Sequence, residues 1–342
     1  MKVRARAPLR LGLAGGGTDV SPYCDEYGGL VLNATIDKYA YASIEESESG
    51  LLEVVSADRE MQQAVEPWDY GSLSDDFALH RGVYQRMTKQ FNNGEGIAVR
   101  ISTHTDAPPG SGLGSSSTLV VAMTTAFAEY FRLSLGQYEI AHLAWEIERV
   151  DLGLAGGRQD QYAAAFGGFN FMEFNTDGGV IINPLRIRRW IMSELEASLL
   201  LYFGGVSRES AAIIEQQADN VRRGVESAVG ATHGLKHEAL RMKESLLKGN
   251  FEGMVSSLHS GWLAKQALAD SITNPAIEEA HQTATRCGML AGKVSGAGGG
   301  GFMMMLVDPV RRMDVIRGLS EVGGRVSTCH FTHEGAESWL VR

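Results

Sequence analysis

The pattern of apolar and polar positions predicts a strand at the start of the chain. Every second residue from Val3 to Leu11 is apolar, and three of the four residues between them are arginines, the last of which is Arg10. Alternation with a period of two indicates a strand with one polar face. Further strand-like stretches follow at 30–44, 51–56 and 97–103. This mixture of strands and turns favours an antiparallel-rich α+β layer over regular βαβ winding.

Two helices are predicted next. Residues 115–131 are apolar almost all round after three serines, which indicates a buried helix. Residues 137–151 carry apolar side chains at helical spacing, from Ile140 to Ile147. A hairpin is expected at 167–182, with its turn at 175–179.

The polar segment 184–193 is the best candidate linker between two domains. After it the pattern predicts a strand at 198–203, a long helix at 209–247, a strand at 302–307, a helix at 311–322 and a last strand at 325–332. We therefore predict two α+β domains, 1–188 and 189–342.

Composition narrows the class of protein. The 342 residues include 41 glycines, about 12% against a usual ~7%, but only 8 prolines, so the chain is neither disordered nor collagen-like. A net charge of −10 argues against a general binder of nucleic acid or membrane surfaces. Three cysteines without metal-type spacing indicate free thiols, and no signal peptide or membrane-spanning run is seen. We expect a cytoplasmic protein.

The first of three glycine-rich stretches ends the opening strand. Gly15, Gly16 and Gly17 are followed by Thr18 and Asp19. Glycines let the backbone turn tightly and leave room for a ligand. Asp19 could accept sugar hydroxyls or cap the segment that follows, and the residues alone leave both open.

The second stretch, Pro-Pro-Gly-Ser-Gly-Leu-Gly-Ser-Ser-Ser at 108–117, stands directly before the first predicted helix. Alternating glycines free backbone N–H groups to point inward, and the helix N-terminus adds partial positive charge. Serine caps alone would not need three spaced glycines, so the stretch favours phosphate binding. It is not a Walker A loop, because it has no lysine.

The third stretch, 293–302, has five glycines in six positions. Gly296, Gly298 and Gly301 match G-x-G-x-x-G, but a strand is predicted after them instead of a helix, which excludes a dinucleotide site. The stretch is either a wall against a ligand or a close approach of two backbones.

Phosphoryl transfer also needs carboxylates, for a metal and for the acceptor hydroxyl. Glu146 and Glu148 flank the apolar stripe of the second helix at similar angles, so periodicity does not choose between them. Asp160 enters an apolar run, where an unpaired aspartate costs free energy. A functional role is favoured for Asp160, with helix capping as the alternative.

The order of these stretches, with the acidic helix between the second and third, resembles the GHMP small-molecule kinases over essentially the whole chain. The resemblance implies an α+β, two-domain fold: an N-terminal domain with a left-handed βαβ-type phosphate loop and a ferredoxin-like C-terminal domain with the glycine-rich loop 293–302. Residues 11–19 look like the branch that phosphorylates heptose phosphates and fucose.

The same resemblance implies the site residues and cofactors. Asp160 is the implied catalytic aspartate, Ser116 and Glu148 hold Mg²⁺, and Arg10 lies near the transferring phosphoryl group, although its place on the charged side of the strand also suits a solvated face. The implied ATP-binding residues are Pro109, Gly110, Ser111, Gly112, Leu113, Gly114, Ser115, Ser116 and Ser117. The implied sugar-binding residues are Gly16, Gly17, Thr18, Asp19, Gly298 and Gly299.

The implied reaction is ATP-dependent phosphorylation of the C1 hydroxyl of D-glycero-D-manno-heptose 7-phosphate, for surface polysaccharide. Two features depart from relatives: Gly16-Gly17 replaces Glu-His, and the interval from Glu148 to Asp160 is one residue longer than in mevalonate kinase. The candidates for the 7-phosphate are Lys38, Arg186, Arg188, Arg189 and Arg208. A fucose- or galactose-type kinase and a non-catalytic nucleotide or sugar sensor are the alternatives. The expected partners are ATP and a small sugar phosphate, with no nucleic acid or membrane and no indication of oligomeric state.

Overall fold

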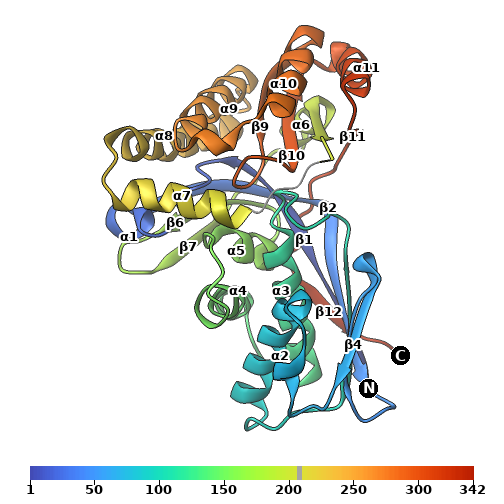
Figure 1. Ribbon diagram of the computed structural model, residues 1–342. Helices are drawn as coiled ribbons and strands as arrows, with labels where there is room; N and C mark the ends of the chain where they lie inside the picture. Colours follow the sequence, from blue (N-terminus) through green and yellow to red (C-terminus); the bar gives the residue numbers. More distant parts are fainter. Residues whose placement is uncertain (206–209) are drawn as a thin grey trace.

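The computed structural model describes residues 1–205 and 210–342, which form two halves, one above the other in Figure 1. The lower half is a sheet in the order β12-β1-β2-β5-β3-β4, with the β6–β7 hairpin paired to β2. Its strands are β1 (Lys2–Ala14), β2 (Gly29–Glu46), β3 (Leu52–Ser56), β4 (Met61–Val65), β5 (Val99–Thr105), β6 (Phe169–Phe174), β7 (Val180–Pro184) and β12 (Glu337–Leu340). Its helices are α1 (Tyr23–Tyr27), α2 (Ala78–Phe91), α3 (Ser115–Tyr130), α4 (Gln137–Trp145), a π-helical turn (Glu146–Asp151) and α5 (Gln159–Phe166), with short 3-10 turns at Ala57–Arg59, Tyr70–Ser72 and Asp75–Phe77.

The upper half is a four-stranded antiparallel sheet in the order β11-β8-β10-β9, with helices before and after the central hairpin. The sequence of elements gives the β-α-β-β-α-β pattern of a ferredoxin-like domain, as expected. Its strands are β8 (Leu199–Phe203), β9 (Met289–Val294), β10 (Phe302–Val307) and β11 (Arg325–Ser327). Its helices are α6 (Arg189–Ser198), α7 (Ser210–Arg222), α8 (Glu226–Lys248), α9 (Phe251–Gln266), α10 (Pro275–Cys287) and α11 (Arg312–Val322), with 3-10 turns at Asp270–Ile272 and Pro309–Arg311.

Two predicted elements of the upper half differ from the structure. The long helix at 209–247 is divided into α7 and α8, because the chain turns at Gly224, where φ is +64°. The last strand ends at Ser327, and the chain then returns to the lower half, where β12 pairs antiparallel with β1. Both termini therefore lie at the same end of the molecule (Figure 1). The division after residue 188 stays a prediction.

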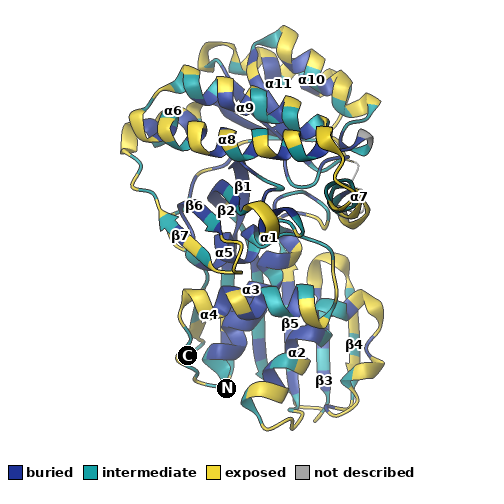
Figure 2. Cartoon of the chain, turned by 90° about the vertical axis from the view of Figure 1, so that its left-hand side faces the viewer, coloured by how far each residue is buried: buried dark blue, intermediate teal, exposed yellow. Residues whose placement is uncertain are grey.

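The core of the lower half forms where α3 packs on β1 and β2. Val120, Met123 and Phe127 are fully buried, as the all-round apolar pattern of this helix predicts. In Figure 2 the helix and the sheet face beneath it are buried along most of their length. This packing fixes the N-terminus of α3, where the predicted phosphate loop ends.

The alternation of β1 does not continue along the whole strand. Val3, Ala5 and Ala7 pack beneath α3, whereas Leu9 packs with residues of the upper half. The pairing with β2 is irregular between Pro8 and Arg10, and from Ala7 onward both faces of the strand are buried. Arg10 is 4% exposed and bonds to the carbonyl oxygen of Gly112, so the alternative of a solvated face does not hold for this residue.

Candidate active site

A cleft of about 280 Å³ brings residues of all three glycine stretches together. Gly16 and Gly17 come from the first stretch, Gly110, Gly112 and Gly114 from the second, and Gly296 with Ala297 from the third. Arg10, Asp19, Ser116, Glu148 and Asp160 line the same cleft. Most residues that the sequence assigned to the site thus meet in one place.

The second stretch forms a loop that only glycines permit. Gly110, Gly112 and Gly114 have φ values of +70°, +78° and +78°. A Cβ on Gly112 would lie 2.3 Å from the carbonyl oxygen of Ser295, and one on Gly114 would lie 3.1 Å from Cγ of Asp160. The glycines therefore let the loop approach both the third stretch and the predicted catalytic aspartate. The loop leads into α3, whose N-terminal partial charge suits a phosphate.

Four members of the predicted ATP-binding set do not line the cleft: Pro109, Ser111, Leu113 and Ser117. Leu113 is fully buried, and its carbonyl oxygen accepts the backbone N–H of Arg10 at 3.1 Å. The buried hydroxyl of Ser117 accepts a hydrogen bond from Gln161 Nε2 at 3.1 Å. Leu113 and Ser117 thus support the loop from behind, and the cleft is lined by the glycines, Ser115 and Ser116.

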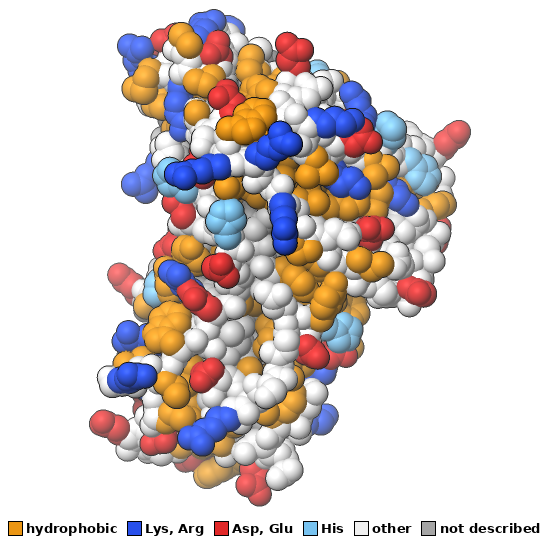
Figure 3. Space-filling model, turned by 180° about the vertical axis from the view of Figure 1, so that it is seen from behind, with side chains coloured by type: hydrophobic (Ala, Val, Ile, Leu, Met, Phe, Trp, Pro, Cys, Tyr) orange, Lys and Arg blue, Asp and Glu red, His pale blue; other side chains and the backbone are white. Residues whose placement is uncertain are grey.

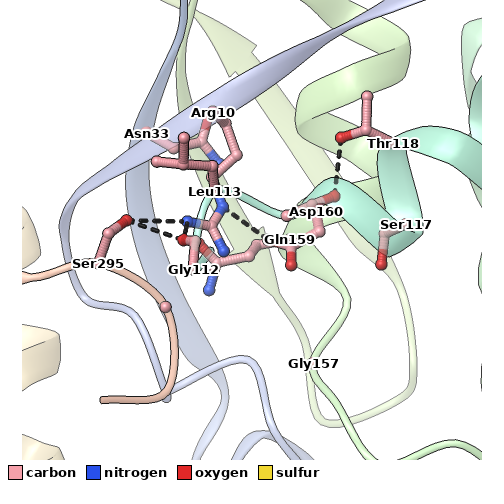
Figure 4. Close-up of polar contacts among 12 residues, drawn as sticks. Arg10, Asn33, Gly112, Leu113, Ser117, Thr118, Gly157, Gln159, Asp160 and Ser295 are labelled. Carbon is pink, nitrogen blue, oxygen red and sulfur yellow. Dashed lines mark hydrogen bonds and ion pairs between the residues drawn. The ribbon is translucent and has the colours of Figure 1, made fainter. Parts of the chain in front are cut away.

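An ion pair joins the two predicted catalytic residues (Figure 4). Arg10 Nε donates to Asp160 Oδ1 at 2.7 Å, and Arg10 Nη1 donates to the carbonyl oxygen of Gly112 at 2.8 Å. The Arg10 side chain is buried, while that of Asp160 is 22% exposed. The guanidinium thereby fixes the Asp160 carboxylate beside the glycine loop of the second stretch and leaves part of the carboxylate open to the cleft.

Of the two candidate glutamates, Glu148 is the one in the cleft. It is fully buried, and its Oε2 accepts from Gln161 Nε2 at 2.5 Å. Its Oε1 has no hydrogen-bond partner among the described residues. Glu146 is partly exposed and pairs with Arg86 at 3.0 Å. The π-helical turn that holds both residues is a feature often found at functional sites.

The unpartnered oxygen of Glu148 fits a metal ligand. A buried carboxylate oxygen is costly without a donor or a cation, and the Ser116 hydroxyl lines the same cleft. The described residues contain no group of three or more His, Cys, Asp or Glu side chains arranged around a metal position. Mg²⁺ in phosphotransferases is usually held by one or two protein oxygens together with substrate phosphates and water, so this donor set suits it.

The carboxylate of Asp19 accepts most of its hydrogen bonds from other residues of the protein. Its Oδ2 accepts the N–H groups of Arg158 at 2.9 Å and Gln159 at 3.0 Å, and its Oδ1 accepts from Gln159 Nε2 at 2.9 Å. It therefore caps the start of α5, the helix that carries Asp160. Thr18 is fully buried and does not line the cleft, because its hydroxyl bonds to the backbone of Gly15 and Leu30. The expected sugar contact of Thr18 is not supported.

Only part of the third stretch lines the cleft. Gly296 and Ala297 line the cleft, whereas Gly298 and Gly299, expected to touch substrate, face Ile272. The N–H of Gly299 donates to the Ile272 carbonyl oxygen at 2.8 Å. Neither glycine lines the cleft, so the expected substrate contact is not supported; a Cβ on Gly298 would lie 3.0 Å from Cγ2 of Ile272.

Two buried lysines line the cleft and were not assigned to the site by the sequence. Lys265 comes from α9 and Lys293 from β9. Burial lowers the pKa of Lys265 to about 8, with repulsion by Arg10 adding to it, and it lowers the pKa of Lys293 well below its usual value. Lys265 falls on the buried stripe of α9 with Met254, Leu258 and Trp262, a position where a charge is unusual. That is the signal the sequence offered.

Gln159 and Arg149 also line the cleft without having been predicted. The Arg149 guanidinium donates to the carbonyl oxygens of Leu154 at 3.3 Å and Gly157 at 3.2 Å. It therefore holds in place the loop between Glu148 and Asp160.

The basic residues suggested for the 7-phosphate are not in the cleft. Arg208 lies outside the described residues, and Lys38, Arg186, Arg188 and Arg189 do not line the cleft. The last three are exposed. Figure 3 shows that Lys and Arg side chains on the rear surface gather mainly on the upper half, above its junction with the lower half.

Comparison with known proteins identifies the family of the chain. Residues 78–168 match the GHMP kinases N terminal domain, and residues 242–325 match the GHMP kinases C terminal domain. A D-glycero-alpha-D-manno-heptose 7-phosphate kinase from Campylobacter jejuni is 43% identical, with 99% of each chain covered. The chain belongs to the GHMP kinase family.

Other GHMP kinases show how far the likeness extends. The crystal structure of a D-glycero-D-manno-heptose 1-phosphate kinase from Bacteroides thetaiotaomicron matches with a TM-score of 0.83, 44% identity and 99% of each chain covered. An L-fucokinase/L-fucose-1-P guanylyltransferase from Bacteroides fragilis is 27% identical over 93% of this chain and 36% of its own length. None of the described helices is long and apolar enough to cross a membrane.

Proposed function

We propose that this GHMP kinase transfers the γ-phosphoryl group of ATP to the C1 hydroxyl of D-glycero-D-manno-heptose 7-phosphate and forms the 1,7-bisphosphate. The observation that carries the proposal is the Arg10–Asp160 pair, 2.7 Å apart, beside the glycine loop and the N-terminus of α3. The name of the C. jejuni relative supports the substrate. Such a product would be a precursor of nucleotide-activated heptose for surface polysaccharide. Three free thiols and the use of ATP support a cytoplasmic location.

In this reaction the bond from the sugar O1 to the γ-phosphorus forms as the bond from that phosphorus to the bridging oxygen of ADP breaks. Asp160 orients the C1 hydroxyl and accepts its proton. Arg10 offsets charge on the transferring group, and the loop N–H groups with the N-terminus of α3 hold the nucleotide phosphates. Glu148 Oε1 and the Ser116 hydroxyl would hold Mg²⁺, which neutralises charge on the phosphate oxygens when bound.

A substrate panel tests this proposal. The two heptose kinases above are named for opposite ends of the sugar, the 7-phosphate in one and the 1-phosphate in the other. ADP release should therefore be measured with both anomers of heptose 7-phosphate, with heptose 1-phosphate, and with fucose and galactose. We expect the highest kcat/KM with a heptose 7-phosphate, and phosphorus NMR should show the new phosphate on C1.

Other outcomes would assign a different function. A preference for fucose or galactose would contradict the proposal and favour a kinase like the B. fragilis relative. No ADP release with any sugar would contradict kinase activity itself and favour a nucleotide or sugar sensor.

A further inference from the structure

Lys265 and Lys293 are two buried amino groups without a carboxylate partner among the described residues. The two residues are 6% and 8% exposed, and both line the cleft. Lys265 Nζ donates to the carbonyl oxygen of Gly296, and Lys293 Nζ lies 3.5 Å from that of Leu13. Neither ammonium forms an ion pair with a carboxylate in the described part of the chain.

The surroundings of the two lysines are mostly positive. Arg10 repels both ammonium groups, the two lysines repel each other, and Asp19 attracts Lys265 only as a minor influence. Desolvating an ammonium costs several kcal/mol unless an opposite charge compensates it. Two such amino groups beside an open cleft are suited to bind an anion. A dianion that contacts both of them would compensate their positive charges.

The proposed function already assigns partners to the phosphates of ATP. Arg10 is bound to Asp160 and Gly112, next to the glycine loop and the N-terminus of α3. The lysines come from α9 and β9, in the upper half, on different elements from that machinery. The other cations near the cleft are engaged, since Arg149 binds loop carbonyls and Arg158 lies 3.4 Å from Asp25.

We propose that Lys265 and Lys293 together bind the phosphate ester that the sugar already carries, and that this pair selects phosphorylated sugars over unphosphorylated ones. The inference rests on the proposed function, because it assigns the second phosphate of that substrate. It replaces the exposed arginines 186, 188 and 189 as the cationic pocket for this group.

Lys265→Met and Lys293→Met test the pair, with Lys248→Met as the matched control. Methionine keeps the length of the buried stem without the charge. Lys248 is exposed and pairs with Glu244 on its own helix. The kcat/KM should be measured for heptose 7-phosphate and for unphosphorylated heptose, together with the KM for ATP. We expect the ratio of the two kcat/KM values to fall at least about tenfold in each buried variant, as for loss of a charge-assisted hydrogen bond. The control should keep the wild-type ratio.

The outcomes separate this inference from the proposed function. An unchanged ratio in both folded variants, checked by their circular dichroism melts, overturns the lysine assignment. An equal fall with both sugars and a raised KM for ATP also overturns it, and places the lysines on the transferred phosphate. If the wild-type enzyme uses only unphosphorylated sugars, the proposed function fails. Calorimetry of heptose 7-phosphate without ATP then decides the inference, which fails if wild type and Lys265→Met bind it equally.

Discussion

Replacing Glu148 by glutamine tests the proposed magnesium site with almost no change of shape. The side chain is fully buried, its Oε1 has no described donor, and an amide oxygen can still accept from Gln161. The change keeps most of the hydrogen bonding but removes an ion pair with Arg149, at 3.9 Å, so we expect the free energy of unfolding of the metal-free protein to fall by about 1–3 kcal/mol. Removing even an outer partner of a metal costs about 10–100-fold in affinity or activity, so a lost direct ligand should cost at least that much.

The assay is ADP release as a function of Mg²⁺ concentration at saturating sugar phosphate and ATP. In Glu148→Gln the Mg²⁺ concentration that gives half the maximal rate should rise at least about tenfold. Glu146→Gln is the control, because it lies two residues away, is partly exposed and pairs with Arg86 at 3.0 Å. It should cost about 0–1 kcal/mol of stability and leave the Mg²⁺ dependence unchanged. A wild-type Mg²⁺ requirement in Glu148→Gln, or an equal shift in both variants, would refute the assignment.

Three further predictions follow from the cleft. Asp160→Asn should lower kcat by orders of magnitude and leave the calorimetric Kd for ATP within about threefold, and near-normal turnover would exclude the proton-accepting role. Gly114→Ala should lower kcat and destabilise the protein more than Gly178→Ala. Both glycines have positive φ, but only a Cβ at position 114 meets Asp160, at 3.1 Å from its Cγ. Equal kcat values in the two variants would contradict this. Lys265 has a pKa of about 8 in the folded protein against 10.5 for an unperturbed lysine, so the folded protein binds fewer protons than the unfolded chain between these pH values. As the pH rises from 8 to 10.5, the free energy of unfolding of the wild type should therefore increase by about 3 kcal/mol relative to Lys265→Met. A difference in urea melts that does not depend on pH would show that burial does not destabilise the ammonium.

The conformation of the glycine loop before α3 could be predicted because it depends on neighbouring residues. The alternating glycines and the helix that follows them are adjacent in sequence, and the backbone conformation depends on residue types within a few positions. The buried pattern of α3 is also a property of one continuous segment. The structure confirms that this loop ends at a buried helix.

The choice between Glu146 and Glu148 depends on residues that flank the apolar stripe of the helix. Ala141, seven residues before Glu148, is fully buried and extends the buried face towards Glu148, whereas His142, four residues before Glu146, is exposed. The apolar stripe used for the prediction did not include Ala141. The π-helical turn adds a change of pitch that a periodicity of 3.6 residues does not represent.

Arg10 shows a second limit, because its burial depends on segments far away in the sequence. The alternation of β1 assigns it to the same face as Arg4 and Arg6, but both faces of the strand are buried from Ala7 to Ala14, and Arg10 bonds to the carbonyl oxygens of Gly112 and Leu113. The pattern of the strand alone does not show which distant loop covers its polar face.

The lysines show the limit that matters most for substrate choice. Lys265 and Lys293 are separated from Arg10 by more than two hundred residues in the chain, and only the packing of the upper half on the lower half places all three beside one cleft. The glycine loops supply backbone N–H groups, which bind any phosphate in the same way. Discrimination between sugars must therefore come from side chains such as Lys265 on α9, where no motif marks the position, and Lys293 at the edge of the third glycine stretch. The sequence could thus predict phosphoryl transfer from the loops, but the residues that select the acceptor could be located only in the folded chain.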